Sequence, residues 1–487
     1  MSSAQLPDAD DFQRQSDEFA SWLVSLPGVT VNSKIRIADL RGNAAGRGVV
    51  AQSDVVEGEE LFTIPRDLVL STHNSKLKGL LSQDLEELGP WLSLMLVMIY
   101  EFLQGDRSAW APYFKVLPRD FDTLMFWSPS ELQELQGSAV VEKIGKDGAE
   151  TSILEGIAPI VRSHPSLFPP VDGLASYSGD AGTRVLLNLA HTMGSLIMAY
   201  AFDIEKQENE DEREGEDGYL TDEEEEQSSK GMVPLADMLN ANADMNNARL
   251  FQEEMSLVMK AIKPISGGEE IFNDYGEIPR ADLLRRYGYV TDNYAPFDVV
   301  ELSLDLLCSC AGLRDSDIEN QPLLHILSKW DLLDDGYDIP RPAPGDSLAD
   351  ALPEELVVLL TTLSLSPDQG AYQQQKQKPP KPSFDKPEAT LLLNAIQQSC
   401  RRYNTTIAQD HSLLVQLNHS QASSGPLDVS ARRLRMAIQV RIGEKEIFED
   451  LVSRLRAFLA ASDASSTSKR SAGDNDDDSR RTKARRS

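Results

Sequence analysis

The chain has 487 residues, of which 41% are apolar, and a formal net charge of -31. This length suits two or three domains of about 100–200 residues each, and the apolar share is sufficient for full cores. The negative charge argues against non-specific nucleic-acid binding by the body of the protein. It suits a basic protein partner, although most acidic proteins are simply soluble. We expect a monomer that contacts neither nucleic acid nor a membrane directly.

The chain contains three cysteines, Cys308, Cys310 and Cys400. They form no CxxC pair, so we expect neither a disulfide framework nor a zinc site, and we predict no bound metal. The acidic N-terminal segment lacks the apolar core of a signal peptide. The most apolar run, Trp91–Tyr100, is too short to span a bilayer. These features are typical of a protein in a reducing compartment.

Strand signals dominate the early part of the chain. Residues 1–15 are predicted to be disordered, and Ser16–Leu26 has a helical apolar spacing that ends before a Pro-Gly pair. Short β-rich runs follow, separated by Gly and by Asp or Glu turns. These predicted strands are Val29–Val31, Ile35–Ile37, Gly48–Ala51 and Leu61–Pro65.

Residues 76–202 form a helical block between two strand regions. Helices are predicted at Trp91–Leu103, Ser130–Gln136 and Thr183–Phe202. The next stretch, 203–230, holds 14 Asp and Glu residues against 3 Lys and Arg, a net charge of -11. Because such a composition cannot bury a core, we predict a disordered acidic loop there.

Strands return after the acidic loop and then give way to helices. The strands are predicted at Arg249–Phe251, Leu257–Ala261 and Glu270–Phe272. The helices are predicted at Arg280–Tyr287, Asp298–Cys310, Leu323–Leu332, Glu354–Leu363, Glu388–Asp410 and Ser430–Leu459. Residues 366–386 are rich in Gln, Lys and Pro, which indicates a mobile loop.

The final segment, 461–487, is predicted to be disordered. It carries two basic clusters, Lys469-Arg470 and Arg480–Arg486. Their spacing suits a bipartite nuclear-import signal, and a solvated basic tail explains it equally well. We predict localisation in the nucleus, with the cytoplasm as a further location.

Three short segments contain residues suited to a ligand site. In Gly46-Arg47-Gly48 the glycines let a ligand approach the backbone, although an ordinary turn explains this tripeptide alone. Asn240 ends the apolar run Val233–Leu239, and its amide can bind a ligand or cap a turn. Tyr275 lies in a turn between a strand and a helix, where its ring suits either a cavity wall or a core.

Taken together and in order, these segments resemble the signature segments of the SET-domain protein-lysine methyltransferases. They read GRGVVA at 46–51, VPLADMLNANAD at 233–244 and EEIFNDYGEIPRADLLRRYGYV at 269–290. The wide gap between the first two resembles the Rubisco large-subunit methyltransferase class, as do Trp110–Ser138 and Ala431–Leu451. Within that class the chain is most similar to the fungal ribosomal lysine methyltransferase 4 and SET domain-containing protein 6 groups. The resemblance covers roughly residues 20–460.

The resemblance implies an α+β fold. We expect a β-rich SET domain at 16–294, with a helical insertion at about 76–202 that precedes the acidic loop. An all-α substrate-binding domain would follow at 295–460. No cysteine-rich segment follows the SET motifs, so this helical domain, rather than a zinc lid, is expected to close the site.

The resemblance also implies roles for individual residues. Tyr275 is the expected catalytic residue, with its hydroxyl at the methyl-transfer centre. The residues expected to bind the cofactor S-adenosyl-L-methionine are Gly46, Arg47, Gly48, Tyr200, Asn240, Ala241 and Tyr275. Trp110 and Tyr289 are expected to wall the lysine channel. Many SET domains have Asn-His where this chain has Asn240-Ala241, so one imidazole contact is lost.

Lysine methylation places a clear demand on such a site. Lysine attacks only as the neutral amine, and neutralising it at pH 7 costs about 4.6 kcal/mol from its reference pKa. An aromatic, apolar channel disfavours the ammonium, so no strong general base is required. A tyrosine at Tyr289 rather than phenylalanine leaves less room for further methyl groups, which predicts monomethylation. The resemblance implies that the substrate is a protein of the large ribosomal subunit.

Two other functions are consistent with the same residues. A non-catalytic SET-like scaffold could bind a basic protein through its acidic surface. A histone lysine methyltransferase would suit the nuclear tail, but the missing cysteines after the SET motifs weaken that interpretation. The presence of Asn240 and Tyr275 favours an enzyme over a scaffold.

Overall fold

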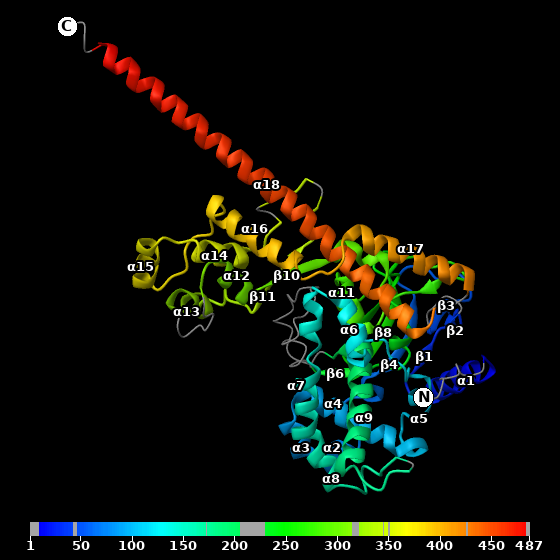
Figure 1. Ribbon diagram of the computed structural model, residues 1–487. Helices are drawn as coiled ribbons and strands as arrows, with labels where there is room; N and C mark the ends of the chain where they lie inside the picture. The colour runs from blue at the N-terminus through cyan, green and yellow to red at the C-terminus, as the bar shows by residue number, and fades with distance from the viewer. Residues whose placement is uncertain are drawn as a thin grey trace. The chain divides into compact units, whose positions relative to one another are not determined.

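The computed structural model describes residues 9–41, 46–171, 173–204, 229–313, 321–343, 345–348, 351–424 and 427–483. The chain, followed from end to end in Figure 1, divides into two compact units. The first unit consists of Met1–Phe126, Ile144–Ile278 and Asp282–Tyr294, and the second of Trp127–Lys143, Pro279–Ala281 and Ala295–Ser487. The short pieces 127–143 and 279–281, which we predicted within the first domain, therefore belong to the second unit.

The first unit contains most of the strands, and each predicted strand is present. They are β1 (Thr30–Val31), β2 (Ile35–Asp39), β3 (Arg47–Ala51), β4 (Glu60–Pro65), β5 (Ala201–Asp203), β6 (Lys230–Met232), β7 (Ala248–Gln252), β8 (Ser256–Ala261) and β9 (Glu270–Ile271). They form the antiparallel sheets β1-β4-β8-β7, β2-β3-β9 and β5-β6. In the second of these sheets Val49 lies opposite Ile37 on one side and Ile271 on the other. This register places the first motif beside the third.

The helices of the first unit lie mainly between β4 and β5, as predicted for the insertion. They are α1 (Ala9–Ser25), α2 (Leu77–Leu80), α3 (Ser82–Glu87), α4 (Gly89–Gln104), α5 (Ala111–Val116), α7 (Lys146–Ser152), α8 (Ala158–Ser163), α9 (Gly179–Tyr200) and most of α11 (Arg280–Tyr287). Helix α1 begins within the segment 1–15 that we predicted to be disordered. Its Phe12 is buried, with the guanidinium carbons of Arg41 and Arg47 each 3.8 Å from the ring centroid. This tertiary packing stabilises a turn that local sequence alone does not.

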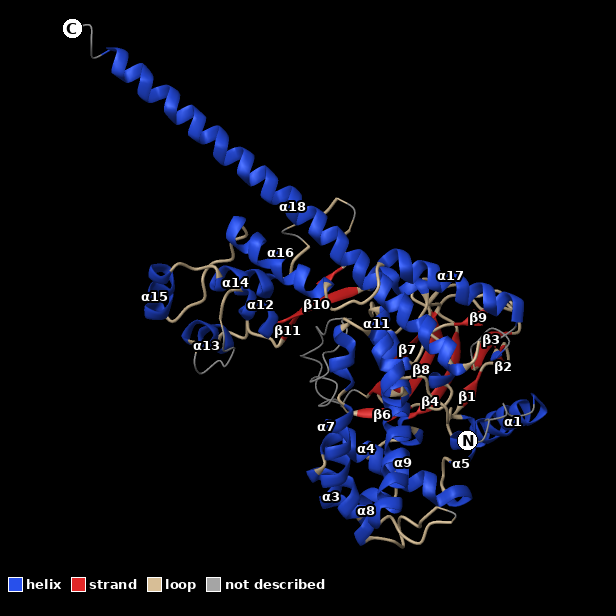
Figure 2. Cartoon of the chain, in the orientation of Figure 1, coloured by secondary structure: helices blue, strands red, loops and turns tan. Residues whose placement is uncertain are grey.

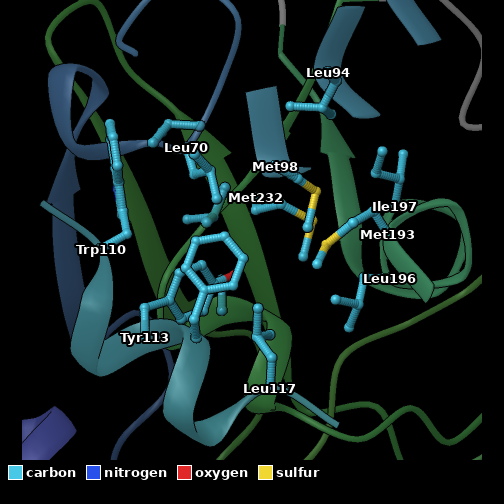
Figure 3. Packing of buried hydrophobic residues seen from close by; sticks show 14 of the residues in the cluster. Leu70, Leu94, Met98, Trp110, Tyr113, Leu117, Met193, Leu196, Ile197 and Met232 are labelled. Atoms are coloured by element: carbon cyan, nitrogen blue, oxygen red, sulfur yellow. The ribbon is translucent and has the colours of Figure 1, made fainter. Parts of the chain in front are cut away.

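The insertion helices and the strands share one apolar core. Figure 3 shows side chains of α4, α9 and β6 meeting there, among them Met98, Met193 and Met232. Trp110 and Tyr113 enter the same core from the start of α5. The core fixes the end of α9 relative to β6, and the candidate site lies at that junction.

The acidic stretch connects two paired strands. Residues 205–228, the greater part of the predicted loop 203–230, lie outside the described residues. Its two ends belong to β5 and β6, where Lys230 Nζ lies 2.9 Å from Asp203 Oδ1. The disorder predicted for this stretch stays a prediction.

The second unit is almost entirely helical, as Figure 2 shows. Its helices are α6 (Pro129–Leu132), α12 (Leu304–Cys310), α13 (Pro322–Lys329), α14 (Glu354–Leu363), α15 (Pro367–Lys376), α16 (Lys386–Cys400), α17 (Ile407–Ser424) and α18 (Val429–Lys483). One antiparallel pair, β10 (Val299–Ser303) and β11 (Gly336–Pro340), interrupts the all-α pattern that we predicted. The period-2 burial of Val300 and Leu302 explains this strand within the predicted helix 298–310.

Two segments of the second unit correct predictions of disorder. The mobile loop predicted at 366–386 contains α15, which Ser366 and Gln369 begin with a reciprocal capping box. The disordered tail predicted at 461–487 is helical to Lys483 as a continuation of α18, and 484–487 lie outside the described residues. No proline interrupts the sequence of α18, and extending a helix is easier than nucleating one.

A buried polar network connects α17 to α18 within the second unit. Arg441 Nη2 donates to Asp410 Oδ1 at 2.8 Å, and Lys445 Nζ donates to Asp410 Oδ2 at 2.5 Å. Burial by itself would raise the pKa of Asp410, but these two hydrogen bonds hold it below its ordinary value. The network therefore joins the two helices and keeps the Asp410 carboxyl ionised. Within the described residues no helix is long and apolar enough to cross a membrane.

Candidate active site

A pocket of about 200 Å³ opens in the first unit where three separate segments meet. The end of α9 with β5, the turn before Asn240, and the segment after β9 form its walls, and the last residue of α11 completes them. The lining residues are Ala199, Tyr200, Ala201, Phe202, Asp203, Ala236, Asp237, Leu239, Asn273, Asp274, Tyr275 and Tyr287. The second and third motifs of the sequence thus contribute directly to one cavity.

Backbone hydrogen bonds hold the second and third motifs side by side. The N–H of Asn273 donates to the carbonyl of Asn240 at 2.9 Å, and Ala241 forms a parallel bridge with Asn273. The N–H of Asn242 donates back to the carbonyl of Asn273 at 3.3 Å. Tyr275 follows this pairing after one residue, so its position is set by main-chain contacts rather than by a flexible loop.

The first motif joins the same assembly through Asn240. Its Nδ2 donates to Glu270 Oε1 at 2.7 Å and to the carbonyl of Arg47 at 3.4 Å. A Cβ at Gly48 would lie only 2.9 Å from Glu270 Oε1 and 3.0 Å from Asn240 Nδ2, so only glycine fits there. Half-burial raises the pKa of Glu270, and the bond from Asn240 offsets part of that rise. The sequence analysis did not predict a role for Glu270, the first residue of β9, although a Gly-Gly turn lies shortly before it.

The side chain of Arg47 is engaged within the fold rather than left for a ligand. Its Nη1 donates to the carbonyl of Val116 and its Nε to Ser16 Oγ, both at 3.0 Å. Burial lowers the pKa of Arg47 to about 10. Gly46, just before it, is exposed, and its carbonyl accepts from the N–H of Leu40 at 2.9 Å. Gly46, Arg47 and Gly48 are not among the residues that line the pocket.

Three tyrosines form a connected cluster at the pocket. The rings of Tyr275 and Tyr287 stack with centroids 4.1 Å apart and 11° between their planes. Tyr289 meets Tyr287 edge-on at 6.4 Å. Burial raises the pKa of Tyr275 and of Tyr289 well above the ordinary value, so both hydroxyls remain neutral. A neutral hydroxyl can both donate and accept a hydrogen bond.

A glycine between the last two tyrosines makes this arrangement possible. Gly288 has φ of 76°, and a Cβ there would lie 2.8 Å from the backbone nitrogen of Thr123. The left-handed turn ends α11 and directs the chain from Tyr287 to Tyr289. Tyr289 itself is not among the residues that line the pocket, and its ring packs edge-on against Tyr287.

An acidic side chain lies buried in the pocket wall. Asp237 is 8% exposed and accepts a short hydrogen bond from the hydroxyl of Tyr113 at its Oδ2. Burial raises the pKa of Asp237 to about 7. Burial, and to a lesser degree the charge of Asp237, raises the pKa of Tyr200 to about 12. Sequence reasoning missed this acid, although an Asp inside the apolar run Val233–Leu239 is an unusual placement.

The backbone before Asp237 is strained. Leu235 has φ of 75° although it is not a glycine, and it is buried. A short 3-10 turn, Ala236–Met238, follows it. This turn contains Asp237, which lines the pocket. Strained residues of this kind persist only where surrounding structure holds them, and they gather at functional sites.

Trp110, predicted to wall a lysine channel, is not among the residues that line the pocket. Its ring is 6% exposed in the apolar core, where Figure 3 shows it, and its Nε1 donates to the carbonyl of Leu68 at 3.0 Å. The indole needs that acceptor once it is buried, and the bond holds it in the core. In the described part of the chain, no group of three or more His, Cys, Asp and Glu side chains is arranged to hold a metal ion.

Family models match both parts of the chain. The model described as SET domain matches residues 46–276, and the model described as Rubisco LSMT substrate-binding matches residues 321–448. Ribosomal lysine N-methyltransferase 4 of Saccharomyces cerevisiae is 38% identical over 305 residues, which cover 61% of this chain and 59% of that protein. N-lysine methyltransferase SETD6 of Bos taurus is 32% identical over 340 residues, covering 67% and 68%.

The fold has solved counterparts as well. The crystal structure of the SET domain of LSMT bound to lysine and AdoHcy aligns with a TM-score of 0.67 over 91% of each chain, at 21% identity. At 21% identity this similarity concerns the fold alone. The bovine relative, at 32% identity, is similar in sequence as well. The chain spans less than two thirds of the yeast relative and slightly more than two thirds of the bovine one. With its strands, insertion and helical second unit, the chain belongs to the family of SET-domain protein-lysine methyltransferases.

Proposed function

We propose that this chain is an S-adenosyl-L-methionine-dependent protein-lysine N-methyltransferase. One observation carries the proposal: residues of the second and third motifs line a pocket in which the ring of Tyr275, whose hydroxyl is neutral, stacks on Tyr287. Such a hydroxyl can align an amine without taking part in proton transfer. The name of the yeast relative, a ribosomal lysine methyltransferase, supports the same reaction.

The residues of the site fit the methyl donor. S-adenosyl-L-methionine supplies an electrophilic methyl group on a positively charged sulfur. The backbone at exposed Gly46, where nothing lies within 4 Å of a Cβ position, permits the close approach that a long polar ligand needs. Asn240 uses its amide N–H groups within the fold, which leaves its side-chain oxygen to accept from the ligand. We assign further contacts with S-adenosyl-L-methionine to Ala241 in the second motif and to Tyr200 at the end of α9.

The tyrosine wall serves the lysine. Making the amine neutral at pH 7 costs about 4.6 kcal/mol in water, and an apolar aromatic surface lowers that cost by disfavouring the ammonium. Tyr275 and Tyr287 provide such a surface, and both line the pocket. Tyr289 meets Tyr287 edge-on, and we propose that its hydroxyl restricts added methyl groups. We therefore assign monomethylation to this enzyme.

We assign the substrate to the proteins of the large ribosomal subunit. The net charge of -31 favours a basic protein over an acidic one, and ribosomal proteins are rich in Lys and Arg. The yeast relative carries a ribosomal name, which supports this class above histones. The helical second unit, matched by a substrate-binding family model, would hold the substrate protein.

Transfer of labelled methyl groups tests the reaction and the substrate together. Wild type and Tyr275→Phe are incubated with labelled S-adenosyl-L-methionine and, separately, with large-subunit ribosomal proteins and with histones. We expect one ribosomal band that disappears with Tyr275→Phe. As a matched control, Tyr372→Phe removes an exposed hydroxyl from α15 and should leave the band unchanged. Labelling of histones alone would reject the ribosomal class, and no labelling at all would favour a scaffold.

We also propose a nuclear location, for which the basic clusters Lys469-Arg470 and Arg480–Arg486 are the support. Replacing both clusters by alanine in a fluorescent fusion should move the protein to the cytoplasm. A fusion that stays nuclear without them would reject this role for the tail.

A further inference from the structure

The two carboxyl oxygens of Asp237 differ in their hydrogen bonding. Its Oδ2 accepts from Tyr113, whereas Oδ1 is buried and forms no hydrogen bond with any described residue. Buried polar atoms without a partner are rare in folded proteins and usually mark a ligand or a functional strain. Since Asp237 lines the pocket, the missing partner of Oδ1 is expected to come from what the pocket binds.

The ionisable groups that line the pocket are acids and tyrosines, with no Lys, Arg or His among the lining residues described. Asp203 is exposed and lies 2.9 Å from Lys230 Nζ, and exposed Asp274 accepts from Asn246 at 2.8 Å. Only Asp237 is buried without a cation. The titratable groups that face it or share the pocket are Tyr113, Tyr200, Asp203, Asp274, Tyr275 and Tyr287. The wall is thus built to receive a positive charge.

We infer that the carboxylate of Asp237 is the counter-charge for a positively charged centre bound in this pocket, the chemistry shared by a sulfonium and a lysine ammonium. This inference rests on the proposed function. Tyr113 fixes the carboxyl through Oδ2, while Oδ1 forms no hydrogen bond with a described residue. In a buried site an opposite charge interacts far more strongly than it would in water. Asp237 acts as a positioning residue and takes no part in methyl transfer.

Protonation links this role to pH. Burial raises the pKa of Asp237 to about 7, so the free protein holds the group partly protonated near neutrality. A bound cation favours the ionised form, and the carboxyl then releases its proton to solvent. Affinity for a cationic ligand should accordingly rise between pH 6 and pH 8, while affinity for a neutral analogue should not, by linkage of binding to deprotonation.

The test compares ligands that differ by one charge. S-adenosylmethionine and S-adenosylhomocysteine are titrated by calorimetry at pH 8 into the full chain and into Asp237→Asn. If the sulfonium is the partner, the variant loses about tenfold or more in affinity for the first ligand and little for the second. A second arm titrates L-lysine and L-norleucine in the presence of S-adenosylhomocysteine. A loss confined to L-lysine assigns the ammonium instead. Equal losses within both pairs, or no loss in either, would overturn the inference.

A matched control separates charge from burial. Glu444→Gln removes another buried carboxyl whose pKa is raised to about 7, in the second unit and away from the pocket lining. It should leave both ligand affinities unchanged. A loss there that matches the loss with Asp237→Asn would indicate a general effect on the fold.

The wild type alone provides a second measurement in case Asp237→Asn does not fold. At pH 7, calorimetry in two buffers of different ionisation enthalpy measures the protons released on binding. Release with the cationic member of a pair and not with its neutral analogue supports the inference, and equal release with both overturns it. If the wild type binds neither S-adenosylmethionine nor S-adenosylhomocysteine, the proposed function fails and this inference falls with it. Binding of both with the same response rejects the inference alone.

Discussion

Two buried carboxyl groups, one in each unit, share an elevated pKa and differ in their partners. Burial raises the pKa of both Asp237 and Glu444 to about 7. Glu444 accepts from Ser138 at one oxygen and from Tyr403 at the other, at 2.5 and 2.9 Å. Asp237 has a partner at only one oxygen. A raised pKa is therefore shared by an acid with partners at both oxygens and an acid with a partner at one, so a perturbed pKa alone does not distinguish a functional acid from a structural one.

A third acid, Asp410, marks the structural extreme. It is fully buried, and each of its oxygens accepts from a cation, Arg441 at one and Lys445 at the other. Its pKa is held low for that reason. Both carboxyl oxygens of Asp410 and of Glu444 in the second unit thus have partners within the fold, whereas Oδ1 of Asp237 in the first unit has none among the described residues.

The largest effect is expected from removing the acid of the satisfied network. Asp410→Asn leaves two buried cations without their counter-charge, which should lower the free energy of unfolding by about 3–5 kcal/mol. Urea denaturation measures it. The exposed pair Lys386–Asp463 in the same unit provides the control, since Asp463→Asn should change stability by less than about 1 kcal/mol. Losses of equal size would show that burial does not make the Asp410 network contribute more to stability than the exposed pair.

A smaller loss should follow from a methyl group at the crowded end of the first motif. A Cβ at Gly48 meets Leu40, Glu270 and Asn240, so Gly48→Ala should cost about 1–3 kcal/mol and weaken binding of S-adenosylmethionine. Gly46→Ala adds the same methyl group where nothing lies within 4 Å and should leave stability unchanged. Denaturation and calorimetry measure both variants. A Gly48→Ala protein as stable as wild type would contradict the close approach described for Asn240 and Glu270.

The pH dependence of stability should differ between wild type and Glu444→Gln. The folded-state pKa of Glu444 is raised to about 7, so its protonated form favours folding, and that stability is lost as pH rises from about 4.5 to 7. The glutamine variant has no such proton to lose. Melting temperatures between pH 4 and 8 should therefore fall less in the variant. Parallel curves for the two proteins would mean that Glu444 does not titrate in this range.

The smallest effect on stability, and a distinct effect on product, is expected at the tyrosine cluster. Tyr289→Phe removes one hydroxyl next to Tyr287 and keeps the ring that meets it edge-on. We expect little change in melting temperature and a shift from monomethyl-lysine towards di- and trimethyl-lysine, read by mass spectrometry. Tyr372→Phe on α15 is the matched control. Unchanged product ratios in both variants would remove Tyr289 from the control of product.

Several elements follow from local patterns alone. The strands β1 to β4 and β7 to β9 and helix α11 lie where alternation and helical spacing place them, because each has a clear period and a turn on either side, whereas β5 and β6 were not predicted. Helix α15 was missed although its start carries a capping signal at Ser366, because the Gln- and Pro-rich composition was given more weight. The helical continuation of α18 to Lys483 was missed because its composition is polar.

The sequence by itself determined the strand and helix periods, the order of the three motifs and the chemistry that their residue types allow. Only the tertiary structure decided which side chains meet. Trp110 lies in the core because a buried indole finds its acceptor at Leu68, and Arg47 packs against Phe12 instead of facing a ligand. Asp237 faces the pocket with one oxygen unfilled. Such outcomes depend on partners distant in the chain, and no local pattern contains them.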